Sequence, residues 1–192
     1  MALIQPHPVL LRRAQAGDAR AFEQLVEAYQ APLFSYILRI VNGDRALAED
    51  LCQDVLLRVY QNLAGFSLRS SFTTWLFQVA KHRVYDELRA RDRRVRPTVD
   101  LDACPWLAGT SEPERQVEDM AAVWAAIGAL PVDLKMALLL RDVVGLSYLE
   151  IADVLDVTLA TVKWRIYRGR EDVQAALGDT LPSRGSATAA TA

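Results

Sequence analysis

The sequence predicts an all-α protein: an N-terminal helical bundle and a C-terminal four-helix domain with a helix-turn-helix, joined by a flexible acidic linker. Apolar residues recur every three or four positions through residues 18–96 and 120–177, which is the period of amphipathic helices. Residues 97–119 carry proline, glycine and acidic residues without a sustained period, as linkers do. The tail, residues 178–192, is rich in small and polar residues and is expected to be disordered.

Composition indicates a folded protein, because 52% of the 192 residues are hydrophobic and four are tryptophan. The cysteines, Cys52 and Cys104, have neither the spacing of a metal pair nor that of a disulfide framework, which suggests a reducing cytosol. No apolar run approaches the ~20 residues that span a bilayer. The N-terminus has its basic residues after its apolar ones, the reverse of a signal peptide. We therefore expect a cytoplasmic protein without membrane contact.

Charge is unevenly distributed, although acidic and basic residues nearly cancel at 24 against 22. Residues 81–96 hold seven basic and three acidic side chains, and residues 163–170 hold four basic and none acidic. Residues 97–120 instead hold six acidic and one basic. Two positive patches on either side of a negative connector favour a nucleic-acid partner, which the net charge alone does not indicate.

The first helices of the bundle follow from their apolar spacing. One is predicted from Asp18 to the break at Asn42-Gly43-Asp44, and a second over residues 48–63, AEDLCQDVLLRVYQNL. The polar side of the second helix holds a compact patch formed by Asp50, Gln53 and Asp54. A basic partner surface could bind this patch, but the helix dipole explains acidic residues near a helix start without any function. The spacing alone therefore does not assign it a role.

The third bundle helix changes character along its length. The loop GFSLRSS precedes it, with Ser70 and Ser71 available as caps, and the helix is predicted over residues 71–94. Its first half is apolar and its second half is basic. A solubilising helix end would explain two or three basic residues, but a phosphate-binding tip better explains seven.

The C-terminal domain is predicted to begin with two helices. An apolar stripe runs from Met120 to Leu130, Pro131 suits the first turn of the next helix, and Gly145 ends it. A helix-turn-helix then follows over residues 147–170. Ser147 with Glu150 forms a capping box, and Thr158 can cap a second helix that starts near Leu159.

A helical wheel separates two sides of that second helix. Val162, Ile166, Val173 and Leu177 fall within one arc and are expected to be buried. The other side collects aromatic, basic and polar residues: Thr161, Lys163, Trp164, Arg165, Tyr167 and Arg168. A merely solvated helix has no use for exposed aromatics, so this pattern predicts DNA recognition in the major groove.

Nothing in the sequence assembles a catalytic site. The histidines, His7 and His82, lie in a proline-flanked terminus and on the basic helix, and there is neither a phosphate-binding glycine loop nor a metal-binding spacing. We therefore expect a protein that is not an enzyme and uses no metal or cofactor.

Three segments resemble bacterial extracytoplasmic-function (ECF) sigma factors, which direct RNA polymerase to promoters. AEDLCQDVLLRVY resembles the family's core-polymerase-binding helix, FTTWLFQVAKHRVYDELR its minus-10 reading helix, and LSYLEIADVLDVTLATVKWRIYRGR its minus-35 helix-turn-helix, in the family's order. Leu76 stands where housekeeping sigma factors carry a second tryptophan wedge, as is usual in the ECF group. Ala160 and Trp164 replace smaller or more flexible residues common in the group, so the resemblance does not give the minus-35 sequence.

The resemblance implies core RNA polymerase and promoter DNA as partners, and it assigns roles by position. Core polymerase would bind Asp50, Gln53 and Asp54. Minus-10 DNA would bind Phe66, Ser67, Leu68, Arg69, Ser70, Ser71, Lys81, His82 and Arg83, with the loop holding a flipped base. Minus-35 DNA would bind Thr161, Lys163, Trp164, Arg165, Tyr167 and Arg168. Because family members are commonly held inactive by an anti-sigma factor, such a partner is a further expectation.

Two alternatives belong to other functional classes. A dimeric helix-turn-helix transcription regulator would use the N-terminal half as a sensor or dimerisation domain, but it would need a ligand pocket rather than an acidic patch and a basic helix tip. An adaptor that binds only proteins would not explain two separated basic patches.

Overall fold

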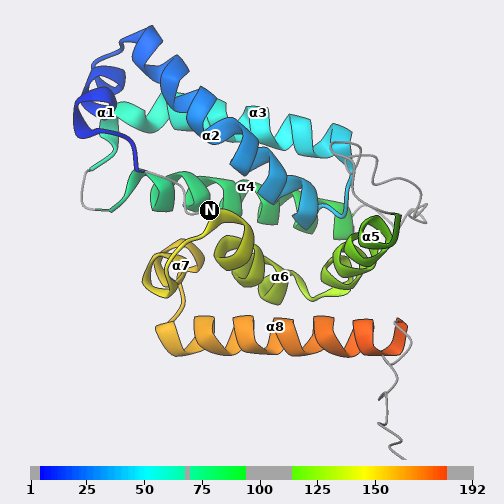
Figure 1. The fold of residues 1–192 in the computed structure, drawn as a ribbon. Coiled ribbons are helices and arrows are strands. Elements are labelled where there is room, and N and C mark those ends of the chain that lie inside the picture. Colours follow the sequence, from blue (N-terminus) through cyan, green and yellow to red (C-terminus); the bar gives the residue numbers. More distant parts are fainter. Residues whose placement is uncertain (1–4, 68–69, 94–113, 181–192) are drawn as a thin grey trace, which may run out of the picture.

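The structure, a computed structural model, describes residues 5–67, 70–93 and 114–180. No strand forms among these residues, and the predicted all-α class in two helical regions is confirmed. Figure 1 shows α1 to α3 on one side of the molecule and α5 to α8 on the other, with α4 between the two groups. The predicted residues Leu68 and Arg69, most of the 97–119 linker and most of the tail lie outside the described ranges.

The N-terminal half contains α1 (Pro8–Gln15), α2 (Ala19–Ile40), α3 (Arg45–Asn62), the 3-10 turn η1 (Leu63–Gly65) and α4 (Phe72–Arg93). The sequence reading did not anticipate α1, a short helix with proline at its start and a His7 side-chain cap. The breaks between α1, α2 and α3 have local causes. Asp18 and Asp44 accept hydrogen bonds from the backbone N–H groups of Ala21 and Leu47, and so cap α2 and α3.

The C-terminal half contains α5 (Glu114–Ala129), α6 (Val132–Leu139), the π-helical turn η3 (Leu140–Val144), α7 (Tyr148–Leu155) and α8 (Leu159–Thr180). Helix α5 begins inside the range predicted as linker, directly after Pro113, a residue favoured at helix starts. Helix α8 runs past residue 177, where the domain was expected to end.

The predicted helix-turn-helix is present as α7 and α8. The capping box is complete, since the Ser147 hydroxyl accepts from the Glu150 N–H while the Glu150 carboxylate accepts from the Ser147 N–H. Asp156 ends α7 in the left-handed conformation, with φ of 56°. Thr158 then accepts from the N–H of Thr161 and caps α8. Local chemistry thus sets both helix starts and the end of α7.

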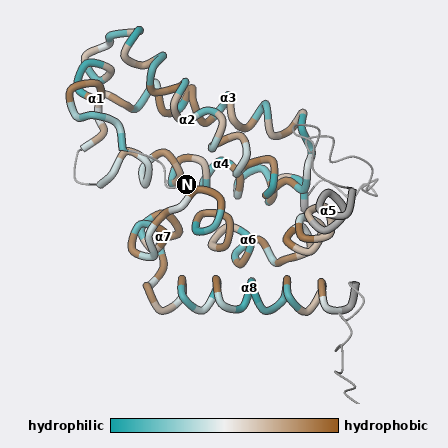
Figure 2. Tube along the Cα trace, in the orientation of Figure 1, coloured by the Kyte–Doolittle hydropathy of each residue, from teal (hydrophilic) through white to brown (hydrophobic). Residues whose placement is uncertain are grey.

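Large apolar side chains of α2, α3 and α4 form the N-terminal core. Tyr36 and Phe77 are fully buried and meet edge to face, with ring centroids 5.3 Å apart. Figure 2 shows hydrophobic and hydrophilic residues in bands that alternate along the helices, as amphipathic packing requires. Each fully buried aromatic or aliphatic side chain contributes about 1.5–3 kcal/mol to folding, so the core holds these helices firmly.

The two halves also pack directly on each other. Helix α4 packs against α7, and α2 packs against α6 (Figure 1). The guanidinium of Arg39 on α2 lies over the Trp124 ring on α5, 3.9 Å from its centroid. The Lys135 ammonium on α6 donates to Asn42 Oδ1, 2.6 Å away, at the end of α2. The N-terminal and C-terminal halves are therefore joined by a direct interface.

Candidate nucleic-acid interface

Helix α8 presents the outward aromatic face that the wheel predicts. Val162 and Ile166 are buried, whereas Trp164 is 59% exposed and Tyr167 is 64% exposed. Two large aromatic side chains held in solvent on the second helix of a helix-turn-helix can contact base edges or sugars in a groove. The burial pattern thus leaves the predicted reading face open.

Polar neighbours of the aromatic pair are also accessible. Lys163 is exposed, and Thr161 shares a hydrogen bond with Thr158. Arg168 pairs with Glu171 and Asp172 on the following turn, with nitrogen–oxygen distances of 3.6 and 3.0 Å. Exposed ion pairs of this kind are weak, so DNA phosphate can replace them at little cost.

Arg165 differs from the other residues assigned to this face. Its side chain is 16% exposed, and Nη2 lies 3.3 Å from Asp133 Oδ2 on α6. The same Asp133 carboxylate accepts a hydrogen bond from the Tyr85 hydroxyl on α4. The structure therefore places Arg165 at the interface between the two halves, away from Trp164 and Tyr167.

The predicted minus-10 residues of α4 separate onto different sides of the helix. Lys81 is 7% exposed, whereas His82 is exposed. Burial lowers the pKa of Lys81, while the Asp156 carboxylate acts in the opposite direction. The pKa of His82 is lowered by partial burial and by Lys81, against Asp86 and Asp156. Lys81 and His82 therefore both have the helix-turn-helix residue Asp156 as an electrostatic neighbour.

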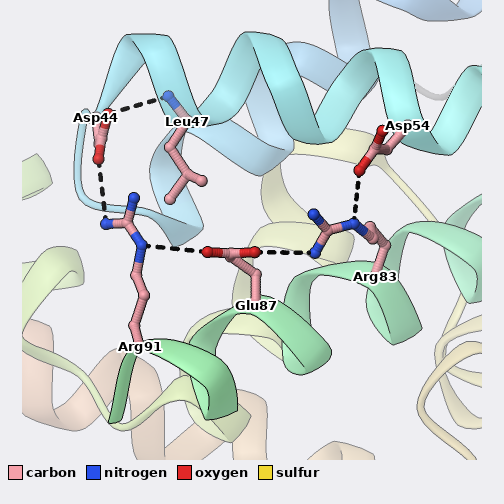
Figure 3. A network of polar contacts seen from close by, with 6 residues as sticks. All are labelled: Asp44, Leu47, Asp54, Arg83, Glu87 and Arg91. Carbon is pink, nitrogen blue, oxygen red and sulfur yellow. Dashed lines mark hydrogen bonds and ion pairs between the residues drawn. The ribbon is translucent and has the colours of Figure 1, made fainter. Parts of the chain in front are cut away.

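Arg83 lies in a network between α3 and α4 (Figure 3). Its Nε donates to Asp54 Oδ2 at 2.9 Å, and its Nη1 donates to Glu87 Oε2 at 3.2 Å. Arg91 extends the chain, since it pairs with Glu87 at 3.5 Å and with Asp44 at 3.2 Å. Burial lowers the pKa of Arg83, but its hydrogen bonds to the two carboxylates outweigh this and raise it.

This network brings together two residues with different predicted roles, Asp54 for polymerase and Arg83 for DNA. The side chain of Arg83 is only 18% exposed, and its guanidinium is already paired with Asp54 and Glu87. Sequence reasoning missed the pairing. The part of the network within α4 could have been predicted, because Arg83, Glu87 and Arg91 follow one another at four-residue spacing. The pairing with Asp54 on α3 has no such signal in the sequence.

The predicted polymerase-binding patch is accessible on α3. Asp50 and Gln53 are exposed, and Asp54 is partly exposed beside Arg83. Sequence reasoning missed Leu57 and Tyr60 on the same helix, which are 54% and 55% exposed. Both lie outside the apolar stripe of the helix, and this position in the sequence pattern could have indicated that they are exposed. The α3 surface therefore combines carboxylates with apolar side chains, a mixture typical of protein–protein contacts.

The loop before α4 is only partly open. Phe66 is buried and stacks on Trp75, with centroids 4.8 Å apart. The Ser71 hydroxyl accepts from the Thr74 N–H at 3.0 Å and caps α4, as predicted. Ser67 and Ser70 are exposed. Any base held by this loop would therefore meet serine hydroxyls before it met the Phe66 ring.

Among the described residues, no group of three or more His, Cys, Asp or Glu side chains is arranged to hold a metal ion. Within the same ranges, no helix is both long and apolar enough to cross a membrane.

Comparison with known proteins covers both halves of the chain. Residues 25–94 match the family described as Sigma-70 region 2, and residues 120–173 match the family described as Sigma-70, region 4. The chain is similar to the RNA polymerase sigma-H factor of Pseudomonas aeruginosa, with 38% identity over 183 residues, or 90% of this chain and 94% of the relative. It is similar to the ECF RNA polymerase sigma-E factor of Escherichia coli K12, with 37% identity over 177 residues, or 86% and 91%.

Solved structures with a similar fold include CnrH in complex with the cytosolic domain of CnrY, with a TM-score of 0.69 and 24% identity over 90% of this chain and 97% of that one. They also include the sigma factor RpoE in complex with the anti-sigma factor NepR from Bartonella quintana, with a TM-score of 0.72 and 24% identity over 83% and 98%. At these identities the likeness supports the fold.

Proposed function

The chain belongs to the ECF sigma factors. From this family assignment we propose which of its surfaces bind polymerase and which bind promoter DNA. It binds core RNA polymerase and directs it to specific promoters. Matches to regions 2 and 4 lie in the family's order, and relatives are similar over nearly their whole length. The alternative of a dimeric regulator with a sensor domain is set aside, because the N-terminal half matches sigma region 2.

Minus-35 DNA is read by α8. The observation that carries this assignment is the outward position of Trp164, Tyr167 and Arg168 opposite the buried Val162 and Ile166. Aromatic edges and a guanidinium fork can contact bases, while Lys163 can contact phosphate. Thr161 and Arg165 complete the proposed surface, although Arg165 must first leave Asp133.

Minus-10 DNA is bound by α4 and the loop before it. The proposed surface consists of Phe66, Ser67, Ser70, Ser71, Lys81, His82 and Arg83. It also includes Leu68 and Arg69, which lie outside the described ranges. The exposed loop serines and His82 support it, whereas Lys81 and Arg83 have other neighbours. Flipping a base costs a few kcal/mol, which the loop contacts must offset.

Core polymerase binds the α3 surface through Asp50, Gln53 and Asp54. Their exposure on one helix inside the region 2 match supports this, and Leu57 and Tyr60 add apolar area beside them. A basic partner surface with apolar residues at its edge fits this composition.

The functional units are proposed as residues 18–96 for polymerase and minus-10 binding, 97–119 as linker, 120–177 for minus-35 binding, and 178–192 as tail. The protein acts in the cytoplasm, where its partners are, and contributes no catalysis of its own. An anti-sigma partner stays a prediction from the family resemblance.

Transcription in vitro tests the proposed function. Core RNA polymerase with this protein and fragmented genomic DNA of the host should give transcripts from a defined set of start sites, each preceded by a shared minus-10 and minus-35 sequence. Core polymerase alone is the control. Transcripts that are the same with and without the protein would contradict the assignment.

A further inference from the structure

We propose that Arg83 of α4 is a positioning residue for polymerase binding, because it holds the carboxylate of Asp54 on α3 in the orientation in which core RNA polymerase binds it. The role of Asp54 at a polymerase surface rests on the proposed function. The contact between the two side chains rests on the geometry, and its effect on polymerase binding can be measured without promoter DNA.

The contact is a charge-assisted hydrogen bond between two packed helices. Arg83 Nε on α4 donates to Asp54 Oδ2 on α3 at 2.9 Å (Figure 3). Hydrogen bonds between ionised groups are roughly twice as strong as those between neutral groups. An aspartate on a helix surface otherwise turns among several staggered side-chain rotamers. The bond therefore selects one orientation of the Asp54 carboxylate in the free chain.

Arg83 can fix its partner because it is itself held at a second point. Its Nη1 donates to Glu87 Oε2 at 3.2 Å, one turn along α4, and only 18% of the Arg83 side chain is exposed. Glu87 is fixed in turn by Arg91, 3.5 Å away. A planar guanidinium bound at two points is pre-organised, so Arg83 presents Nε to α3 from a fixed place.

Asp54 keeps room for a partner while Arg83 holds it. The bond uses Oδ2, and 47% of the Asp54 side chain is exposed. A carboxylate accepts hydrogen bonds at both oxygens, so a cation of polymerase can bind Asp54 without displacing Arg83. The exposed Asp50 lies one turn earlier on α3. The fixed carboxylate therefore continues the accessible acidic patch.

The network around Arg83 remains negative although it contains two arginines. Three carboxylates in it share two guanidinium groups, those of Asp44, Asp54 and Glu87 with those of Arg83 and Arg91 (Figure 3). Neutralisation of the polymerase-binding acid is therefore incomplete. Arg83 orients Asp54 without reversing the attraction of this surface for a basic partner.

The side of α4 on which Arg83 lies fits this role. Residues two apart on a helix point in nearly opposite directions. Lys81, two residues earlier, is buried beside Asp156 of the C-terminal half. Arg83 instead faces α3, the helix that carries the polymerase-binding patch. The helix period thus directs this one cation of the basic stretch to the polymerase side.

Order in the free chain should appear as affinity. Without Arg83, core polymerase has to immobilise the Asp54 side chain itself, which should weaken binding about three- to tenfold. Loss of the Asp54 carboxylate removes the polymerase contact as well, and should weaken binding about tenfold or more. Once that carboxylate is gone, Arg83 has no polymerase-binding group to position. The effect of Arg83 on affinity should therefore depend on Asp54.

A double-mutant cycle on core binding tests this dependence. Core RNA polymerase is immobilised without DNA, and four chains are titrated onto it by biolayer interferometry: the wild type, Arg83→Ala, Asp54→Ala and the double variant. Arg83→Ala should weaken binding about three- to tenfold on its own and cause no further loss in the Asp54→Ala background. Arg45→Ala, which removes an arginine from the exposed pair with Glu49 on α3, is the matched control and should leave the affinity within about twofold.

Two features of the assay separate this role from others. Because no DNA is present, loss of a DNA contact by Arg83 cannot change the measured affinity. Circular dichroism at the assay temperature shows whether each variant is folded. Arg83→Met keeps the apolar stem of the side chain, and takes the place of Arg83→Ala in the cycle if the alanine variant is unfolded.

Three outcomes would overturn the proposal: Arg83→Ala binds core polymerase at least as tightly as the wild type, it weakens binding equally with and without the Asp54 carboxylate, or Arg45→Ala causes the same loss. If Asp54→Ala binds like the wild type, the proposed polymerase surface is wrong, and this inference is wrong with it. If the cycle gives the expected coupling but transcription in vitro fails, the proposed function alone is wrong.

Discussion

Helices α4 and α8 carry the two basic patches of this chain, yet they hold their cations differently. On α8, Arg168 sits in exposed ion pairs beside two outward aromatics. On α4, Lys81 is buried under the other half of the molecule and Arg83 is enclosed by two carboxylates. A basic stretch in a sequence therefore does not equal a set of free cations, because packing decides which charges remain available to a ligand.

The largest expected effect follows from Arg83. We expect Arg83→Ala to lower the free energy of unfolding by about 1–3 kcal/mol, because it removes a partly buried cation from between Asp54 and Glu87. Arg168→Ala, the matched change on α8, should stay within about 0.5 kcal/mol of wild type, since its pairs are exposed. Urea denaturation followed by circular dichroism measures both. Equal stability of the two variants would remove the distinction between the helices.

DNA binding should reverse that order. Arg168→Ala should cost about 1–3 kcal/mol in affinity for a preferred promoter and relax preference at one or two minus-35 positions, because the residue lies beside the outward aromatics. Lys163→Ala should weaken binding to all sequences about equally and reduce the salt dependence by roughly one charge. Selection from a promoter library at two salt concentrations compares the variants. A change of sequence preference in Lys163→Ala alone would mean that α8 is rotated on the DNA.

The two helices also show how far a sequence can be read. The start of α8 was predictable, because the capping box of Ser147 and Glu150 and the cap at Thr158 are local signals within a few residues. So was the outward position of Trp164, which follows from helical periodicity alone. Caps and helical periodicity depend only on residues within one turn or one helix, so a sequence is enough to predict them.

Contacts between distant segments were not predictable in the same way. Arg83 meets Asp54, 29 residues away, and Lys135 meets Asn42, 93 residues away. No period links such pairs, since they depend on how whole helices pack. For the same reason the sequence could not indicate that Lys81 and Arg165, both assigned to DNA, would lie at the interface between the halves.

Lys135 is a second lysine buried at the interface, like Lys81, and the pH dependence of stability should reveal it. Burial lowers the pKa of Lys135 to about 8 in the folded chain, from 10.5 in the unfolded one. Between these values the unfolded state binds the proton and the folded state does not, so stability should rise with pH by roughly 1 kcal/mol per unit. Urea denaturation at pH 7.5, 8.5 and 9.5 measures this rise.

Lys135→Met is the comparison for that measurement. Methionine keeps an unbranched side chain but cannot titrate. The free energy of unfolding of Lys135→Met should therefore rise less with pH than that of the wild type over the same range, whatever its value at pH 7.5. The raised pKa values of the buried tyrosines act at higher pH and are shared by both proteins. Identical slopes in the two proteins would show that Lys135 keeps its proton in the folded state.

The smallest effect is expected at Tyr85, where α4 and α8 come together through Asp133. Tyr85→Phe removes only the hydroxyl that donates to Asp133 and leaves the ring and the Arg165 pair in place. The lost hydrogen bond should lower the free energy of unfolding by about 0.5–1 kcal/mol. Urea denaturation followed by circular dichroism measures this change, with Tyr60→Phe on the exposed surface of α3 as the matched control. If both variants unfolded at the same urea concentration as the wild type, the Tyr85 hydroxyl would contribute nothing to stability, and the contact between α4 and α8 would depend on packing alone.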